Sequence, residues 1–255
     1  MTNISAVVIT HNEEDNIKDC LQSISWAEEI IVIDAHSDDS TVEMSRKFTD
    51  KVYLREFDNF SAQKNYGLSK ASFDWILSID ADERVTEGLK KEIEETIQNQ
   101  PTEKNAFFVE RLNSMYGKFV SYGQPDYQLR LFRKTAGRFE QPVHEEVRFV
   151  GEAGYLTNKL IHYSMRNLSE HLIKINHYTD LEIKILAERG VKINLFCLPW
   201  FFLARPLLRF IESYFLMKGF KDGIRGFLLS VNSMFTEFIK YAKYWEEYIA
   251  KNTWK

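Results

Sequence analysis

Three short apolar runs constrain what this chain can fold into, because each is followed by a stretch with helix-like character. The runs are Ser5–Thr10, Glu29–Asp34 and Phe73–Ile79. Their length and continuity are typical of strands buried on both faces. Asn12 is predicted to cap the helix after the first run, and Ser40 opens a capping box after the second. Buried strands that alternate with helices predict a parallel sheet with helices on both faces.

The pattern changes along the rest of the chain. Further short strands are predicted at Lys51–Arg55, Ala106–Arg111, Gln128–Arg133 and Val147–Val150, and further helices at Ser61–Ala71, Thr86–Gln98, Ser169–Arg189, Pro199–Met217 and Gly223–Lys251. A chain of 255 residues has room for one large domain with a helical extension. We therefore expect an α/β domain over residues 1–165 and a helical region over residues 166–255.

Charge and aromatic residues are distributed unevenly. Residues 1–158 carry 18 Lys and Arg against 28 Asp and Glu, a net charge of −10, whereas residues 159–255 carry 15 against 9, a net charge of +6. Fifteen of the 36 aromatic residues lie between Leu195 and Tyr248. The acidic front half would repel a phosphate backbone, so nucleic-acid binding is not expected.

The expected cellular compartment follows from the lack of a disulfide framework, a signal peptide and a membrane-spanning segment. Cys20 and Cys197 are far apart and form no disulfide framework or zinc motif. The amino terminus has no basic segment of a signal peptide, and the most apolar later stretch, Ile193–Ala204, is too short to cross a bilayer. A cytoplasmic protein is expected.

Asp80 and Asp82 follow a buried strand directly. Residues i and i+2 of an extended chain point to the same side, so both carboxylates project from the strand end where open α/β sheets bind ligands. Mg²⁺ or Mn²⁺ would relieve their repulsion and bridge to phosphates. The alternative is a solvated turn in which an aspartate caps a helix.

Polar side chains at the ends of the first two strands favour a nucleotide. No glycine-rich dinucleotide fingerprint or P-loop is present. The acceptor-rich groups at these ends suit a nucleobase and ribose hydroxyls, although some of them could be helix caps alone; they are Thr10, Asn12, Glu13, Asp34, Ser37 and Asp39. Lys64, Arg130 and Arg133 could reach a pyrophosphate, although a lone basic residue on a helix usually lies on the surface.

Several motifs together resemble those of the inverting glycosyltransferases of family 2, which have the GT-A fold. They are VVITHNEEDNI (7–17), IVIDAHSDDST (31–41), QKNYG (63–67), WILSIDADERV (75–85), PDYQLRLFR (125–133), PVHEEV (142–147) and LIHYS (160–164). The chain is most similar to the bacterial lipopolysaccharide or lipooligosaccharide core β-1,4-glucosyltransferases. The resemblance implies an α/β, Rossmann-like domain with a mostly parallel sheet, a UDP-sugar donor of a hexose such as glucose, Mg²⁺ or Mn²⁺, and a lipid-linked acceptor.

The resemblance also implies roles for individual residues. Asp82 corresponds to the more direct metal ligand, Asp80 to the aspartate nearer the ribose, and His162 to a histidine that completes the metal site. Other positions correspond to donor-binding ones: Asp34 and Asp39 by the base and ribose, Gln63 beside Lys64, Ala81 between the two aspartates, and Gly123 by the donor sugar. The second carboxylate that many relatives have after Asp34 is replaced by Ala35, which leaves base selectivity open.

Inversion needs a carboxylate that takes the proton from the acceptor hydroxyl. Glu145 corresponds to the family's catalytic base, and its neighbour Glu146 is the rival, because adjacent strand residues point to opposite faces.

The basic and aromatic tail has two interpretations. Its helices, rich in Trp, Phe and Leu beside Arg205 and Arg209, can lie on the cytoplasmic face of an anionic inner membrane. They can equally pack on the catalytic domain or on another subunit. The lipid-linked acceptors that the resemblance implies favour the membrane.

Two other function classes compete with sugar transfer. A nucleotidyltransferase also uses paired aspartates and Mg²⁺, but it usually has a Gly-rich loop with Lys or Arg after the first strand, where this chain has His11-Asn-Glu-Glu14. A non-catalytic relative is disfavoured by the retained Asp80, Asp82, Glu145 and His162.

Overall fold

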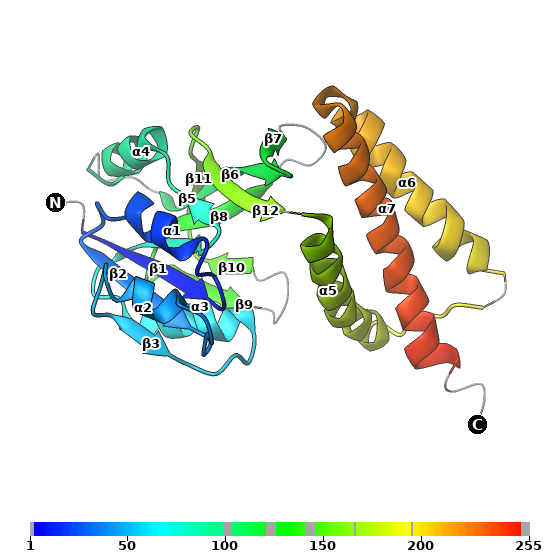
Figure 1. Cartoon of the computed structure of the whole chain (residues 1–255), viewed down its shortest axis with the longest axis horizontal. Coiled ribbons are helices and arrows are strands. Elements are labelled where there is room, and N and C mark those ends of the chain that lie inside the picture. The colour runs from blue at the N-terminus through cyan, green and yellow to red at the C-terminus, as the bar shows by residue number, and fades with distance from the viewer. Residues whose placement is uncertain are drawn as a thin grey trace. The chain divides into compact units, whose positions relative to one another are not determined.

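The computed structural model describes residues 3–98, 104–120, 126–140, 146–165, 167–194 and 196–250. The chain divides into two compact units (Figure 1). The first contains residues 1–112 and 126–163, and the second contains residues 113–125 and 164–255. The second unit therefore includes a segment at 113–125 that lies inside the α/β domain expected from the sequence.

Four parallel strands form one half of the sheet in the first unit, in the spatial order β3-β2-β1-β4. They are β1 (Ile4–Thr10), β2 (Glu29–Asp34), β3 (Val52–Leu54) and β4 (Trp75–Asp80). All three apolar runs found in the sequence are among them, and β2 is buried along its whole length. The predicted parallel arrangement is confirmed here.

The other half of the sheet is mixed. From β4 the order continues β8-β6-β12-β5, with β11 parallel and β7 antiparallel to β6. The strands are β5 (Glu83–Arg84), β6 (Lys104–Met115), β7 (Lys118–Val120), β8 (Tyr127–Arg133), β11 (Glu152–Tyr155) and β12 (Leu160–Met165). A separate antiparallel pair is formed by β9 (Gly137–Glu140) and β10 (Glu146–Phe149).

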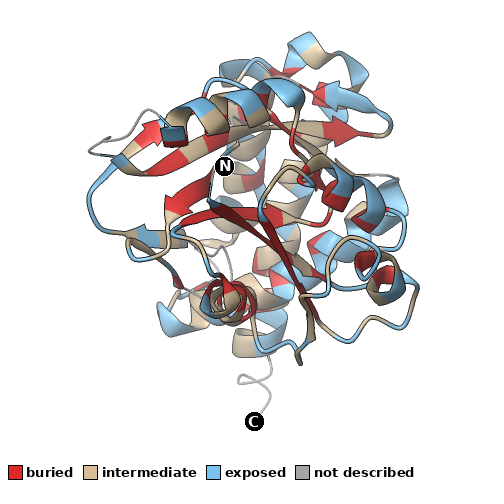
Figure 2. Ribbon diagram, turned by 90° about the vertical axis from the view of Figure 1, so that its left-hand side faces the viewer, coloured by how far each residue is buried: buried red, intermediate tan, exposed pale blue. Residues whose placement is uncertain are grey.

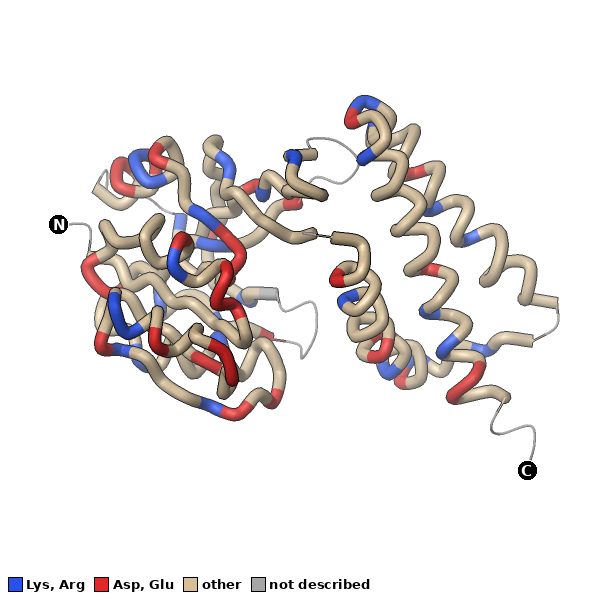
Figure 3. Tube along the Cα trace, in the orientation of Figure 1, with Lys and Arg blue, Asp and Glu red and all other residues tan. Residues whose placement is uncertain are grey.

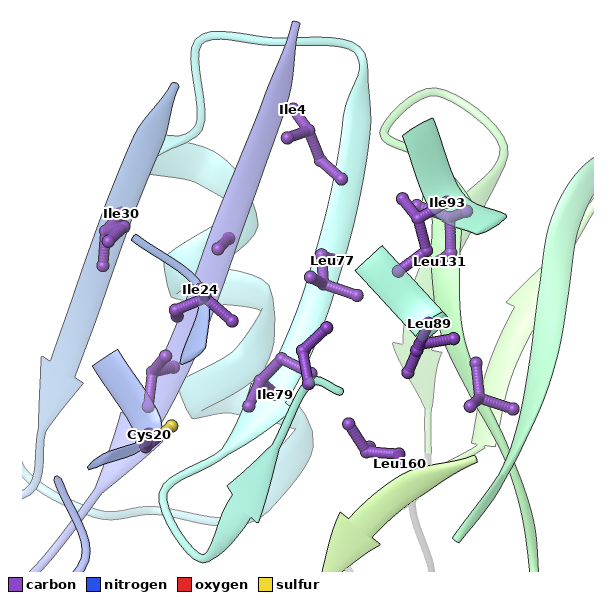
Figure 4. Packing of buried hydrophobic residues seen from close by; sticks show 14 of the residues in the cluster. Ile4, Cys20, Ile24, Ile30, Leu77, Ile79, Leu89, Ile93, Leu131 and Leu160 are labelled. Carbon is purple, nitrogen blue, oxygen red and sulfur yellow. The ribbon is translucent and has the colours of Figure 1, made fainter. Parts of the chain in front are cut away.

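Helices cover both faces of this sheet (Figure 1). They are α1 (Ile17–Ser23), α2 (Thr41–Ser45), α3 (Phe60–Lys70) and α4 (Glu87–Gln98). One face packs its apolar residues with α1 and α4, as Figure 4 shows for Ile24, Leu77 and Leu89. The opposite face packs with α3 and β9. In Figure 2 the buried residues accordingly follow the strands and the inner sides of the helices.

The helix start predicted at Asn12 is wrong, and the start predicted at Ser40 is confirmed without its side-chain cap. Asn12 has a positive φ of 53° and lies in a turn, and the first helix begins after Asn16 instead. Ser40 precedes α2, but its side chain makes no capping hydrogen bond. The side chain of Asn12 and the backbone N–H of Ser40 bind the neighbouring loop instead, and local capping signals cannot detect such contacts.

Among its described residues, the second unit contains two long helices, α5 (Leu168–Glu188) and α7 (Ile224–Tyr244), and the shorter α6 (Arg205–Ile211). The predicted helix at 199–217 is α-helical only in α6, with π-helical turns at Trp200–Ala204 and Glu212–Leu216 on either side. Ile183, Ile193, Tyr241 and Tyr244 form the buried core of this unit. Within the described ranges, no helix has the length and apolarity needed to cross a bilayer.

Candidate active site

The carboxyl ends of three parallel strands bring Thr10, Asp34 and Asp80 to one edge of the sheet. Thr10 pairs in register with Asp34, and Ile9 pairs with Asp80. Asp34 is fully buried. The hydroxyl oxygen of Thr10 is also buried and has no hydrogen-bond partner among the residues that the structure describes. A buried hydroxyl without a partner is costly, so this edge is suited to a polar ligand.

The loops after β1 and β2 are joined by hydrogen bonds. The Asn12 backbone N–H donates to Ser37 Oγ at 2.8 Å, and the Asp38 N–H donates to Asn12 Oδ1 at 3.0 Å. Ser37 in turn donates to Asp34 through its backbone N–H at 2.8 Å and its hydroxyl at 2.6 Å. The predicted nucleotide residues Asn12, Ser37 and Asp34 therefore shape this edge by binding one another.

Asp39 and Glu13 belong to the same pair of loops. Asp39 accepts hydrogen bonds from the backbone N–H groups of Glu14 at 3.1 Å and Thr41 at 2.9 Å. Burial raises the pKa of Asp39, but the hydrogen bonds from Thr41 and Glu14 outweigh it and hold that pKa below its ordinary value. The Glu13 backbone N–H donates to Thr41 Oγ1 at 2.8 Å.

Asp80 lies between two buried cations. Lys64 Nζ is 3.0 Å from Asp80 Oδ1, and Arg130 Nη2 is 2.5 Å from Asp80 Oδ2. Burial raises the pKa of Asp80, but Arg130, then Lys64 and Arg111, lower it further than burial raises it. The carboxylate is therefore ionised across the whole physiological range. The predicted site residues Lys64, Arg130 and Asp80 are brought together.

Glu83 supports this cluster from the protein interior. Its side chain is fully buried and accepts from Arg130 at 2.5 Å, from Arg111 at 3.3 Å and from the backbone N–H of Asp80 at 3.0 Å. Arg111 also binds Asp126 at 2.8 Å. Burial lowers the pKa of Arg130, but Asp80 and Glu83 raise it above its usual range.

Asp82 is paired differently. Its Oδ2 lies 3.3 Å from Nε2 of His162. The pairing of β5 with β12 brings the two together, because Glu83 and Arg84 lie opposite His162 and Ile161. Between the aspartates, the Ala81 carbonyl accepts from Arg84 at 3.0 Å.

The three predicted metal ligands, Asp80, Asp82 and His162, do not all face one another. Among the described residues, no three His, Cys, Asp or Glu side chains are placed to share a metal ion. Asp82 and His162 form a pair, whereas Asp80 faces Lys64 and Arg130. The two aspartates of the motif therefore have different surroundings.

Some predicted residues lie elsewhere. Gln63 is buried and exchanges hydrogen bonds with Arg55. Arg133 pairs with Asp74 and stacks on Trp75 at the amino end of β4, about 16 Å along the strand from Asp80. Gly123 and Glu145 lie outside the described residues, as does the side chain of Glu146.

The sequence did not indicate that Glu83, Arg111 and Asp126 belong to the candidate site. The only available signal was the position of Glu83, directly after the Asp-Ala-Asp triplet. An acidic residue in a turn after a strand is usually solvated, so its complete burial could not be anticipated.

Comparisons with known proteins place the chain in a family. The sequence profile of Glycosyl transferase family 2 matches residues 5–160, more than half of the chain. An uncharacterized glycosyltransferase of Rickettsia typhi is 28% identical over 257 residues, with 95% of this chain and 87% of the relative covered. The lipopolysaccharide core biosynthesis glycosyltransferase LpsC of Rhizobium meliloti is 26% identical over 258 residues, with 97% and 94% covered.

Among solved structures, S. aureus TarS in complex with UDP-GlcNAc matches with a TM-score of 0.49 and 13% identity, covering 92% of this chain and 81% of TarS. The α/β arrangement, with its mostly parallel mixed sheet and carboxyl-terminal helices, is that of the GT-A fold. The chain belongs to glycosyltransferase family 2.

Proposed function

We propose that the protein transfers a hexose, with inversion, from a UDP-sugar to a hydroxyl group of a cell-envelope glycolipid. The observation that carries the proposal is the Asp82–His162 pair, which follows the strand edge occupied by Thr10, Asp34 and Asp80 in a family 2 chain. The buried hydroxyl of Thr10, which has no hydrogen-bond partner within the described part of the chain, suits the polar groups of a nucleotide. Family membership favours transfer of the sugar over synthesis of the nucleotide sugar.

Asp82 and His162 fit a divalent cation. Their facing atoms are 3.3 Å apart, and two adjacent ligands at about 2.1 Å from one ion lie about 3 Å apart. Mg²⁺ commonly uses one or two protein ligands together with substrate phosphates. When bound, Mg²⁺ or Mn²⁺ would neutralise charge on the leaving diphosphate.

The other site residues have separate proposed roles in donor binding and catalysis. In this proposal Asp80 lies on the ribose side of the donor, and its ion pairs with Lys64 and Arg130 hold the carboxylate in position. Glu145, or its neighbour Glu146, removes the proton from the acceptor hydroxyl as that oxygen attacks the anomeric carbon. Attack from the face opposite the diphosphate inverts the configuration of the sugar.

The acceptor is proposed to be lipid-linked, and the second unit to rest on an anionic membrane. The relative LpsC is named for lipopolysaccharide core biosynthesis. Around α6, Leu203, Leu207, Ile211 and Phe215 are exposed and recur every four residues, so they share one helix face. In α7 no charged residue lies between Arg225 and Glu237, and Figure 3 shows a correspondingly long uncharged stretch in this helix. Arg205 and Arg209 lie in α6 itself. An apolar face flanked by cations is typical of helices at a membrane interface.

A thermal-shift panel tests the activity. UDP-glucose, UDP-galactose, UDP-GlcNAc and UDP alone are each added with Mn²⁺, with Mg²⁺ or with EDTA. One UDP-sugar should raise the melting temperature only when the metal is present, because a ligand that binds the folded state stabilises it by mass action. Equal shifts with EDTA would refute the metal assignment, and no shift with any UDP-sugar would refute the donor.

A further inference from the structure

Two exposed tyrosines form a step on the surface of the first unit. Tyr127 begins β8 and is 46% exposed, and Tyr155 ends β11 and is 66% exposed. Their ring centroids are 5.4 Å apart and the ring planes are nearly perpendicular, at 89°. We refer to this pair as the Tyr127–Tyr155 step. Each ring offers an apolar face, and each hydroxyl a polar group, to a ligand.

Neighbouring aromatic residues hold the step in place. Phe108 stacks on Tyr155 with centroids 5.3 Å apart and an interplanar angle of 23°. Phe149 meets Phe108 edge to face at 6.4 Å. Phe108 thus supports the Tyr155 ring, much of which still faces solvent. A ring that is already fixed loses little conformational entropy when a ligand packs on it.

A charged pair borders the step. Glu110 lies opposite Tyr127 in the β6–β8 pairing, and the Tyr127 hydroxyl is 3.5 Å from Glu110 Oε2. Lys159 Nζ is 2.7 Å from the other carboxylate oxygen. A lipid or an apolar helix packed here would desolvate this ion pair at considerable cost. A ligand rich in hydroxyl groups would instead hydrogen-bond to it.

The step is connected to the candidate active site within the same unit. Tyr127 stands three residues before Arg130, which pairs with Asp80, so about 10 Å of strand separates them. Asp126, next to Tyr127, binds Arg111, which binds Glu83. The ion pairs that fix Asp80 therefore also fix the start of β8.

We propose that the Tyr127–Tyr155 step binds the saccharide part of the acceptor. The C–H groups on one face of a hexose carry partial positive charge and pack on the electron-rich face of an aromatic ring. Glu110 and Lys159 accept from and donate to its hydroxyl groups. The inference rests on the proposed glycosyl transfer and adds where the acceptor lies.

The test uses the full-length protein and a core oligosaccharide released from lipopolysaccharide by mild acid. Saturation-transfer NMR measures its contact with the wild type and with Tyr127→Ala, Tyr155→Ala, Tyr127→Phe and Tyr155→Phe. Each alanine variant should weaken binding about tenfold, while each phenylalanine variant stays within about twofold, because the ring face supplies the contact. Tyr178→Ala, on α5 and 39% exposed, is the control and should bind as the wild type does.

Binding of UDP with Mn²⁺ is measured in the same variants and should stay unchanged. Alanine variants that hold the oligosaccharide as tightly as the wild type would overturn the proposal, as would a wild type that makes no contact with it. Phenylalanine variants as weak as the alanine ones would also overturn it, because the hydroxyl would then be the binding group. Absence of UDP binding by the wild type would refute the proposed donor instead. Failure of the acceptor proposal and failure of the proposed function are therefore distinguishable.

Discussion

At the scale of single residues, the two aspartates of the Asp-Ala-Asp triplet have different surroundings. Asp80 belongs to a partly buried cluster in which three acids, Asp80, Glu83 and Asp126, face three cations, Lys64, Arg111 and Arg130. Asp82 lies beside His162. Asp80 is thus held by the protein's own charges, whereas the Asp82–His162 pair has the spacing of two metal ligands.

Asp82→Asn should lower turnover about a hundredfold or more, because an amide is a poor replacement for a carboxylate metal ligand. Isothermal titration with UDP and Mn²⁺ should show the loss directly. Asp74→Asn, at the opposite end of β4, removes an aspartate that pairs with Arg133 and serves as the control. Normal Mn²⁺-dependent UDP binding by Asp82→Asn would show that Asp82 is not a ligand.

Glu83→Gln should destabilise the protein by about 3 kcal/mol, because it leaves Arg130 and Arg111 buried with one carboxylate fewer. Urea denaturation measures the change. Glu87→Gln, which alters an exposed carboxylate of α4, should leave the free energy of unfolding within about 0.5 kcal/mol of the wild-type value. Equal stability of the two variants would mean that Glu83 does not support the cluster.

At the scale of elements, Glu29 ties together the beginnings of several strands. It accepts from Ser5 of β1, from the backbone N–H and hydroxyl of Ser72 before β4, and from Lys51 before β3. Burial raises the pKa of Glu29, but these hydrogen bonds outweigh it and lower the pKa from 4.5 to about 2. This carboxylate therefore holds the amino ends of the parallel strands in register.

The lowered pKa predicts a pH dependence of stability. A carboxylate with a depressed folded-state pKa stabilises the protein above its unfolded-state value and stops doing so as pH falls through the folded-state value. The contribution of Glu29 should thus be complete above about pH 5 and fade toward pH 2.

Glu29→Gln should cost roughly 2 kcal/mol at pH 7 and much less at pH 3, measured by urea denaturation at each pH. Glu43→Gln, in an exposed pair with Lys47, is the control and should change stability little at either pH. A Glu29→Gln penalty of the same size at both pH values would contradict the assignment.

At the scale of the whole molecule, the two units present different surfaces. The first unit has the carboxylate edge and the tyrosine step, and the second exposes apolar side chains on α6 and around it. The charge difference between the front and rear parts of the sequence corresponds to this division. Most acids of the front part lie on its surface, so the charge alone does not identify a site.

Leu207→Glu combined with Phe215→Glu should weaken binding to vesicles of anionic phospholipid by at least about tenfold, because both side chains are exposed on one face of the α6 region. Co-sedimentation of the full chain measures this. Leu54→Glu combined with Phe57→Glu, which places the same added charge at two exposed apolar positions of the first unit, is the control. Wild-type sedimentation of the double variant, with a smaller oligomer in solution, would assign the face to subunit contact instead.

Much of the fold was predictable because its signals are local. A continuous apolar run has to be buried on both faces, so Ser5–Thr10, Glu29–Asp34 and Phe73–Ile79 indicated parallel strands without reference to the rest of the chain. Asn12 does not cap the first helix, because its backbone N–H and its side chain both bind the adjacent loop. Ser40 precedes α2 without a side-chain cap, and its backbone N–H binds Glu14 of the other loop. These contacts span 25 or 26 residues, so local patterns do not report them.

The sequence by itself determined the family, the alternation of strands and helices, and the presence of acids at the end of β4, since all of these depend on short motifs. Only the tertiary structure decided that Lys64 and Arg130 bind Asp80, that His162 lies beside Asp82 while Asp80 faces these cations, and that Arg133 lies at the far end of β4. The physical reason is that ion pairing depends on which strands become neighbours. β8 and β12 join the sheet only after about 45 and 80 further residues have followed Asp80.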